Sequence, residues 1–301
     1  ITGGAGFIGS HLAEALYQKN NLYIFDDLSS GKIENLKNIK KIKSVNFYNK
    51  KIENFNLNKK FDGIFHLCAQ TSVPVSMKFP EVSSKSNFFS TIKVFEIARK
   101  QKIPIVYASS SAIYGNLIKG NDDINEFDII SPYALDKFVL ENFGNLYCNI
   151  YNISSIGLRF FNVYGPRQDP NSPYSGVITN FLNKIDINKK LIIYGGQQTR
   201  DFIYVSDIVK ALIKSMKILI NNKKSFNENI NVGTGKQISI NDLYKKLCNI
   251  YKKDLPYLNK GYLSGDPLRS LGSFKKMEKI LKLNKNNFIK FNDGLKKTIK
   301  N

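Results

Sequence analysis

A glycine-rich turn near the start of the chain restricts the possible fold more than any other stretch. The run TGGAGFIGSHLAEAL places Gly3, Gly6 and Gly9 between a strand end and a helical pattern. Such glycines permit a tight turn and let backbone amides approach a pyrophosphate, which a helix N-terminus favours electrostatically. A second apolar run follows and contains Asp26, 20 residues after Gly6. An acid at this distance can bind ribose hydroxyls and would repel a 2′-phosphate, so the pattern predicts NAD rather than NADP.

Short apolar runs then alternate with helical patterns. Strands are expected at 21–27, 44–49, 61–69, 103–111 and 152–161, with helices at 7–19, 86–101 and 132–148. This alternation is typical of α/β proteins and predicts a doubly wound parallel sheet of the Rossmann type. The second half is less regular, with helices expected near 176–187, 206–219, 239–250 and 274–281, strands at 191–196 and 229–233, and a solvated loop at 221–229.

We therefore predict two regions, whose segments interleave at an approximate boundary. Residues 1–164 form an NAD-binding Rossmann domain, and residues 165–301 form a smaller C-terminal α/β lobe that binds the substrate. The first residues lack an initiator Met and resemble a strand cut in its middle, so an N-terminally truncated fragment is expected.

Composition excludes several classes of function. The net charge is +21, but the basic residues are 40 lysines and only five arginines, scattered along the chain. A nucleic-acid-binding surface more often clusters its charge and uses arginine forks, so no nucleic-acid partner is expected. A nucleic-acid-binding protein stays an alternative hypothesis. His11 and His66 are the only histidines, which disfavours a histidine metal site or a Ser-His-Asp triad, and no metal is expected. Three cysteines without a close pair predict free thiols in a reducing cytoplasm, and no apolar run could span a bilayer.

The stretch SPYALDKFVLENF begins with a helix-start signal, in which Ser131 can cap the helix and Pro132 suits its first position. Tyr133 and Lys137 then lie on one face of the helix, one pitch apart. With 16 tyrosines and 40 lysines, about two such pairs would arise by chance, so the pair alone identifies nothing.

The sequence context of Tyr133 and Lys137 indicates a catalytic function for the pair. The strand at 103–111 ends in serines, and ligands of a doubly wound sheet bind beyond the carboxyl ends of its strands. A serine hydroxyl there could bind a substrate oxygen while Tyr133 takes its proton. We expect the Lys137 ammonium to lower the pKa of Tyr133 from its reference of about 10.

At this point the sequence resembles the extended short-chain dehydrogenase/reductases, the NAD-dependent nucleotide-sugar epimerases and dehydratases, and most closely UDP-N-acetylglucosamine and UDP-glucose 4-epimerases. The resemblance covers essentially the whole chain. It rests on GGAGFIGSHL, DDLSSG, HLCAQTSV, SSSAIYG, SPYALDK, GLRFFNVYGPRQDP, RDFIYVSDI and GDPLRS, in that order.

The resemblance implies a role for each matched position. The catalytic set would be Ser110, Tyr133 and Lys137. The NAD contacts, besides Tyr133 and Lys137, would be Gly3, Gly6, Phe7, Ile8, Asp26, Leu67, Ala69 and Asn87. The UDP-sugar would be held by Ser111, Asn162, Tyr194, Arg200, Arg269 and Ser270. Arg200 is also expected to bind the substrate on physical grounds, because a planar guanidinium suits a diphosphate. The alternative role is a surface ion pair with Asp201 or Asp207.

Two positions depart from the family pattern. Asn49 replaces an aspartate near the adenine, and Leu263 replaces an arginine that usually contacts the diphosphate. Arg269 and Lys260 lie close in sequence to Leu263 and could substitute for that arginine.

The resemblance also bears on the reaction. The dehydratases and decarboxylases of the family carry an acid just after the catalytic hydroxyl, where this chain has Ser111 and Ala112. Elimination of water needs a positioned acid and base, so 4-epimerisation through a transient 4-keto intermediate is expected. Ser270 aligns with a position where a bulky tyrosine closes the sugar pocket of enzymes restricted to UDP-glucose, which favours interconversion of UDP-GlcNAc and UDP-GalNAc.

Alternatives stay open at this point: a 4-epimerase of UDP-glucose or UDP-glucuronate, a 4,6-dehydratase, or a non-catalytic NAD-binding protein. The resemblance further implies a cytoplasmic homodimer with a role in polysaccharide biosynthesis and no membrane partner.

Overall fold

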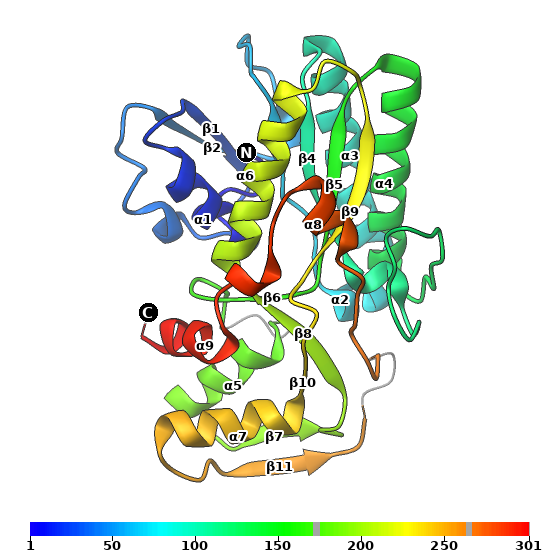
Figure 1. The fold of residues 1–301 in the computed structure, drawn as a ribbon. Helices are drawn as coiled ribbons and strands as arrows, with labels where there is room; N and C mark the ends of the chain where they lie inside the picture. Colours follow the sequence, from blue (N-terminus) through cyan, green and yellow to red (C-terminus); the bar gives the residue numbers. More distant parts are fainter. Residues whose placement is uncertain (171–174, 263–266, 301) are drawn as a thin grey trace.

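The computed structural model describes residues 1–170, 175–262 and 267–300, and its main sheet is parallel (Figure 1). The strands, in spatial order, are β2 (Val45–Asn49), β1 (Leu22–Asp26), β3 (Ile64–His66), β4 (Ile105–Ser110), β5 (Ser155–Phe160) and β9 (Asn227–Val232). Thr2 forms parallel bridges with Phe25 and His66, so the segment before the glycine turn lies between β1 and β3. The predicted α/β fold with a doubly wound parallel sheet is confirmed.

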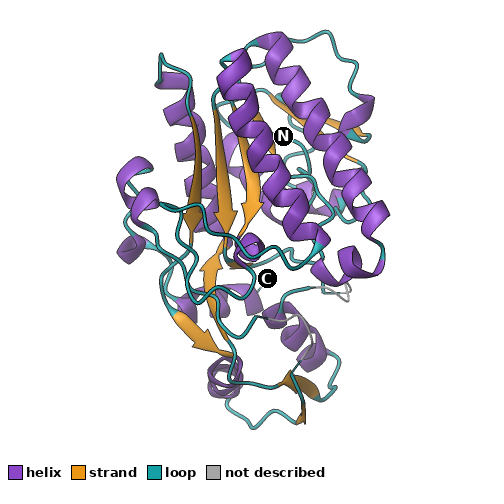
Figure 2. Cartoon of the chain, turned by 90° about the vertical axis from the view of Figure 1, so that its right-hand side faces the viewer, coloured by secondary structure: helices purple, strands orange, loops and turns teal. Residues whose placement is uncertain are grey.

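Helices cover both faces of this sheet, as Figure 2 shows. Helices α1 (Phe7–Leu16) and α6 (Val205–Asn221) pack together on one face, and α3 (Pro80–Gln101) and α4 (Pro132–Tyr151) pack together on the other. Successive strand residues point to opposite faces. Val106 therefore joins the core under α6, while Ile105 and Tyr107 join the core under α3 and α4.

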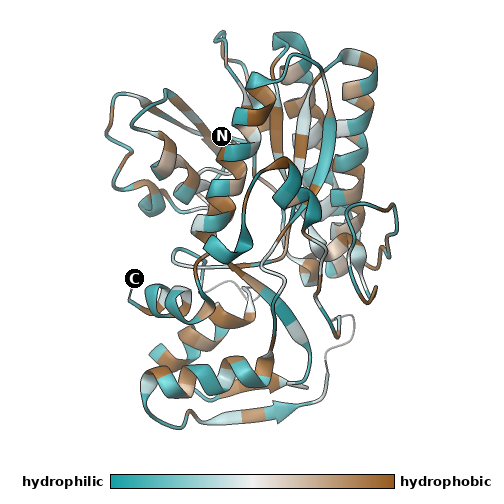
Figure 3. Cartoon of the chain, in the orientation of Figure 1, coloured by the Kyte–Doolittle hydropathy of each residue, from teal (hydrophilic) through white to brown (hydrophobic). Residues whose placement is uncertain are grey.

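A smaller α/β lobe lies below the carboxyl ends of the strands in Figure 1. Its strands are β6 (Asn162–Tyr164), β8 (Thr199–Tyr204) and β10 (Gln237–Ser239) in one sheet, and β7 (Leu191–Tyr194) and β11 (Tyr257–Lys260) in another. Helices α5 (Val177–Asp186), α7 (Ile240–Tyr251) and α9 (Phe291–Ile299) cover a core of their own. Figure 3 shows polar and apolar residues alternating along α6 and α7, as expected for helices that cover a core on one side.

The two regions interleave, and the structure corrects several details. The strand expected at 229–233 in the smaller lobe is β9, which pairs with β5 in the main sheet. The loop expected at 221–229 ends where β9 begins, at Asn227, and the helix expected at 86–101 already begins at Pro80. Helix α8 (Lys275–Ile280) packs on β9 rather than in the smaller lobe. The boundary at 164/165 stays a prediction.

Several short elements have no counterpart in the sequence prediction. They are α2 (Val73–Lys78), α9 and the strands β6, β8, β10 and β11. Cys68, Cys148 and Cys248 are free thiols, as predicted. Within the described ranges, no helix is both long and apolar enough to cross a lipid bilayer.

The glycine turn makes a sharp prediction about stability. A Cβ at position 9 would lie 2.1 Å from the Gly3 carbonyl oxygen and 2.7 Å from the Gly4 Cα, and backbone atoms cannot move aside cheaply. Gly9→Ala should therefore lower the free energy of unfolding by about 1–3 kcal/mol, as overpacking does. Gly6→Ala is the matched control, because a Cβ at position 6 would lie 3.2 Å from the Gly3 carbonyl oxygen. It should lower the free energy of unfolding by less than Gly9→Ala does. Equal losses in denaturant titrations without cofactor would contradict this account of the turn.

Candidate active site

The glycine turn forms a cradle at the carboxyl end of the sheet. Gly3 has φ +69°, and a Cβ there would lie 2.7 Å from the Cys68 nitrogen, so only glycine fits. Helix α1 begins after Gly6, which makes no side-chain cap. The first amides of the helix therefore face the turn as donors for an anionic ligand. This cradle fits the pyrophosphate of NAD.

Asp26 lies at the end of β1, beside this turn. Its carboxylate accepts hydrogen bonds from the amides of Ala5 and Leu28, each at 2.9 Å. Burial raises the pKa of Asp26, and these amides offset part of the rise. On the neighbouring strand Asn49 pairs in register with Asp26 and is exposed. Asp26 is thus positioned for a ribose, and that role stays a prediction.

The predicted cofactor residues Leu67 and Ala69 follow β3, on the other side of the turn. Asn87, from α3, is buried and holds this loop, because its Oδ1 accepts from the Gln70 amide at 2.8 Å. Its Nδ2 donates to the Asp136 carboxylate at 2.7 Å. Asn87 therefore connects the loop after Ala69 to α4. Phe7 and Ile8, at the start of α1, pack against the apolar core of the smaller lobe.

The structure brings Ser110, Tyr133 and Lys137 together at the end of β4. Helix α4 begins as predicted, with the Ser131 hydroxyl accepting from the Ala134 amide and Pro132 in its first turn. The Ser110 side chain lies beside that of Tyr133, close enough to lower the pKa of the phenol. The Lys137 ammonium donates to the Ala108 carbonyl at 2.8 Å and lies 5.7 Å from the centre of the Tyr133 ring.

The electrostatics of this group differ from the expectation. Burial raises the pKa of Tyr133 and outweighs the lowering by the neighbouring Ser110 side chain. The prediction that Lys137 lowers this pKa is wrong, because burial decides the direction of the shift. Burial lowers the pKa of Lys137 itself to about 8, and Cys68, Asp136 and Glu141 oppose this shift.

Residues predicted to hold the sugar nucleotide lie on the segments facing this group from the smaller lobe. Asn162 Nδ2 donates to the Ser270 hydroxyl at 3.2 Å, which brings these two predicted residues together. Arg200, on β8, donates to the Pro267 carbonyl at 2.8 Å and so contacts the segment that carries Arg269 and Ser270.

The other positions named for the sugar nucleotide are less tightly constrained. Tyr194 ends β7 and pairs in register with Lys260, and Arg269 is exposed. Ser111 begins a half-buried 3₁₀ turn. Leu263 lies outside the described residues.

A buried polar cluster next to the site was not predicted. Glu141 and Arg159 form an ion pair with a closest N–O distance of 2.7 Å, and each side chain is 4% exposed. Glu141 lies one helical turn after Lys137, on the same face of α4 as Tyr133. A charged residue at this spacing is a sequence signal from which the cluster could have been predicted.

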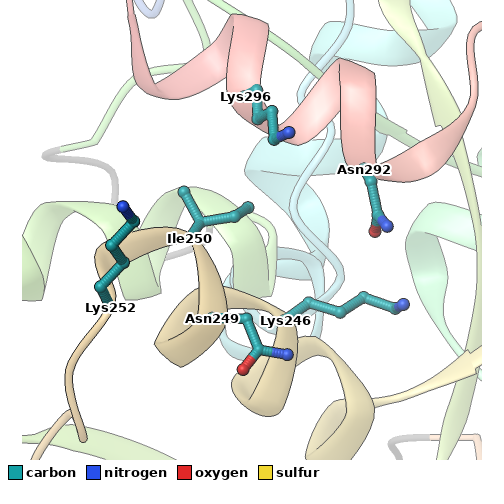
Figure 4. Close-up of a pocket in the computed structure, with 6 residues that line it drawn as sticks. All are labelled: Lys246, Asn249, Ile250, Lys252, Asn292 and Lys296. Carbon is teal, nitrogen blue, oxygen red and sulfur yellow. The ribbon is translucent and has the colours of Figure 1, made fainter.

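A separate cavity of about 370 Å³ lies between α7 and α9 (Figure 4). Its lining residues are Lys246, Asn249, Ile250, Lys252, Asn292 and Lys296. It shares no residue with the predicted site.

The buried ammonium predicts a pH dependence of stability. The native state releases the Lys137 proton near pH 8, while the unfolded chain keeps it to an ordinary pKa of 10.5. Between these values the unfolded state binds more protons, so the free energy of unfolding should rise with pH. Lys137→Met should flatten this rise, whereas Lys85→Met, at an exposed position of α3, should keep it. Urea titrations at pH 7.5 to 10.5 measure the slope, and identical slopes for the two variants would contradict the shift.

Comparison with known proteins identifies the family. Residues 1–233 match the model of the NAD dependent epimerase/dehydratase family. The chain is 32% identical to the UDP-glucose 4-epimerase of Mycolicibacterium smegmatis over 259 residues, which covers 82% of this chain and 80% of that protein.

Solved structures agree. The UDP-N-acetylglucosamine 4-epimerase of Methanobrevibacter ruminantium M1, in complex with UDP-N-acetylmuramic acid, has a TM-score of 0.91 at 35% identity and covers 99% of this chain and 96% of that chain. The UDP-glucose 4-epimerase of Thermotoga maritima, with UDP-glucose, has a TM-score of 0.89 at 32% identity, with the same coverage. The predictions of the family, of NAD as cofactor and of an isomerase are confirmed. The chain belongs to the NAD dependent epimerase/dehydratase family and is an NAD-dependent isomerase.

Proposed function

We propose that this enzyme interconverts UDP-GlcNAc and UDP-GalNAc by inverting C4 through a transient 4-keto sugar. The observation that carries the proposal is the grouping of Tyr133, Ser110 and Lys137 at the sheet edge next to the glycine cradle. Likeness to 4-epimerases of UDP-GlcNAc and UDP-glucose supports it.

The side chains of the site have distinct tasks in this reaction. NAD bound at the glycine cradle would supply the hydride-transfer chemistry at C4 of the sugar. Tyr133 takes the proton of the sugar O4 and later gives it back. Ser110 lowers the pKa of Tyr133 and would offer its hydroxyl to the same sugar oxygen. The Lys137 ammonium is held on the Ala108 carbonyl beside the Tyr133 ring and supplies a positive charge to the buried site.

The residues that follow Ser110 support epimerisation over water elimination. A 4,6-dehydratase needs an acid and a base beside the sugar ring. The 3₁₀ turn η3 (Ser111–Tyr114) presents a hydroxyl and a methyl group at its first two positions instead.

The choice of sugar rests on Ser270. Its hydroxyl accepts from Asn162, and a serine leaves more room than a tyrosine for an acetamido group at C2. UDP-glucose and UDP-glucuronate are the alternative substrates. The nucleic-acid-binding alternative rests on the net charge of +21 alone.

We also propose a homodimer. Exposed apolar side chains lie on the packed pair of helices, namely Val82, Phe89 and Ile92 on α3 and Leu135, Leu146 and Ile150 on α4. A second copy would bury them, and sedimentation would reveal it. A cytoplasmic location and a role in polysaccharide biosynthesis stay predictions.

Tyr133→Phe tests the reaction. It removes the hydroxyl that moves the O4 proton, so turnover should fall by at least about 100-fold, the usual scale for a general base. NAD binding and the unfolding midpoint should change little. Turnover near the parent rate with UDP-GlcNAc would rule out Tyr133 as the base.

Ser270→Tyr tests the sugar. Overpacking costs about 1–3 kcal/mol, which corresponds to a loss of roughly 5- to 150-fold in kcat/KM for UDP-GlcNAc. UDP-glucose carries only a hydroxyl at C2 and should lose much less. Ser270→Ala is the control, because it removes the Asn162 hydrogen bond without adding volume and should leave the ratio of the two specificity constants nearly unchanged. Equal losses on both sugars in the tyrosine variant would show that residue 270 does not face C2.

A further inference from the structure

The Glu141–Arg159 ion pair belongs to a longer path of buried hydrogen bonds. Glu141 accepts from the Ser109 hydroxyl at 2.5 Å and from two nitrogens of Arg159 at 2.8 and 2.7 Å. Ser109 directly precedes the catalytic Ser110, and Glu141 lies on the face of α4 that carries Tyr133. The path therefore begins directly beside the catalytic residues.

Tyr114 continues the path. It ends the turn η3 that starts immediately after Ser110, and its side chain is buried. Its hydroxyl accepts from Arg159 Nη1 at 2.7 Å and donates to Asn231 Oδ1 at 2.8 Å. The Arg159 guanidinium also lies 5.4 Å from the centre of its ring. One hydroxyl thus connects the end of β4 and the adjacent strand β5 to β9.

Asn231 carries the path to the sugar-binding segment. It is fully buried, and its Nδ2 donates to the carbonyls of Gly120, at 3.3 Å, and Ser273, at 3.0 Å. Gly120 in turn exchanges backbone hydrogen bonds of 2.8 Å with Leu271 and Ser273. Leu271 and Ser273 lie just after Ser270, whose hydroxyl accepts from Asn162.

We propose that Tyr114 is a positioning residue that fixes the catalytic Ser110 and the Ser270 segment relative to each other. The inference rests on the proposed function and deepens it. It names the residue that sets the distance between the catalytic Tyr133 and Ser110 and the Ser270 side chain that faces C2 of the sugar. A buried donor or acceptor without a partner is costly, so each group on this path is restricted to one arrangement. A displacement of about 1 Å at a reacting group can cost 100-fold in rate.

The chain offers a matched control in Tyr107. This tyrosine lies on β4, is fully buried, and donates its hydroxyl to Asn229 Oδ1 at 2.8 Å. Tyr107 and Tyr114 therefore each donate to an asparagine of β9, two residues apart. Tyr107, however, packs in the core under α3 and α4, whereas Tyr114 packs in the core under α6.

Tyr114→Phe and Tyr107→Phe remove the same atom from equally buried rings. Tyr114→Phe should lower kcat by about 10- to 100-fold and change the ratio of kcat/KM between UDP-GlcNAc and UDP-glucose. Tyr107→Phe should keep kcat and the ratio of kcat/KM within about 3-fold of the parent values. A substitution away from the reacting groups should lower only the stability of the fold. Assays run well below both unfolding midpoints separate these effects from unfolding. Kinetic constants of Tyr114→Phe that match those of Tyr107→Phe would overturn the proposal.

Hydrogen exchange separates this proposal from the proposed function. If the parent enzyme turns over none of the UDP-hexoses, the proposed function fails, and the path can still be measured. The amides of Gly120 and Ser273, which bond across the segment, should exchange faster in Tyr114→Phe than in the parent and in Tyr107→Phe. Unchanged exchange at both amides would show that Tyr114 does not hold the Ser270 segment.

Discussion

The packing of α4 against the end of β4 holds the whole site together. Three successive strand residues each lie against a helix residue on one face. Ala108 accepts from Lys137, Ser109 donates to Glu141, and Ser110 lies beside Tyr133. Because residues four apart lie on one side of a helix, Tyr133, Lys137 and Glu141 all reach the same strand end. The position of the tyrosine relative to the serine follows from this contact.

The same contact places charges out of water. Lys137 is 5% exposed, and the Glu141–Arg159 pair is buried nearby. Buried ion pairs seldom add net stability, because the cost of desolvation is close to the attraction gained. The contribution of this ion pair is to fix the positions of the elements that it joins. Arg159 has its bidentate contact with Glu141 and its bond to Tyr114, and each partner comes from a different element of the site.

The sequence predicts the parts of the site that depend on local spacing. Gly3, Gly6 and Asp26 follow from one turn and the strand after it, and Tyr133 and Lys137 follow from the helical period. Ser270 and Asn162 were predicted from the resemblance to a family, and the structure shows them hydrogen-bonded. The contacts of Tyr114 and Asn231, which are 117 residues apart, could not be predicted from spacing, because they depend on where β9 enters the sheet.

Two errors have the same physical origin. The strand expected at 229–233, which is β9, is placed in the smaller lobe by the sequence because only its position along the chain, and not its pairing partner, can be read there. The pKa of Tyr133 was predicted from a nearby positive charge, whereas the degree of burial decides its direction. Both pairing partner and burial are tertiary properties.

The most direct test of the central claim follows the hydrogen on C4. Incubation with UDP-GlcNAc deuterated at C4, followed by NMR of the products, should give UDP-GalNAc with the label still on C4 and no net reduction of NAD. Retention shows that the hydride leaves C4 and returns to it, as the arrangement of Tyr133, Ser110 and Lys137 beside the glycine cradle requires. Loss of the label to water, or a 4-keto-6-deoxy sugar as the main product, would contradict 4-epimerisation.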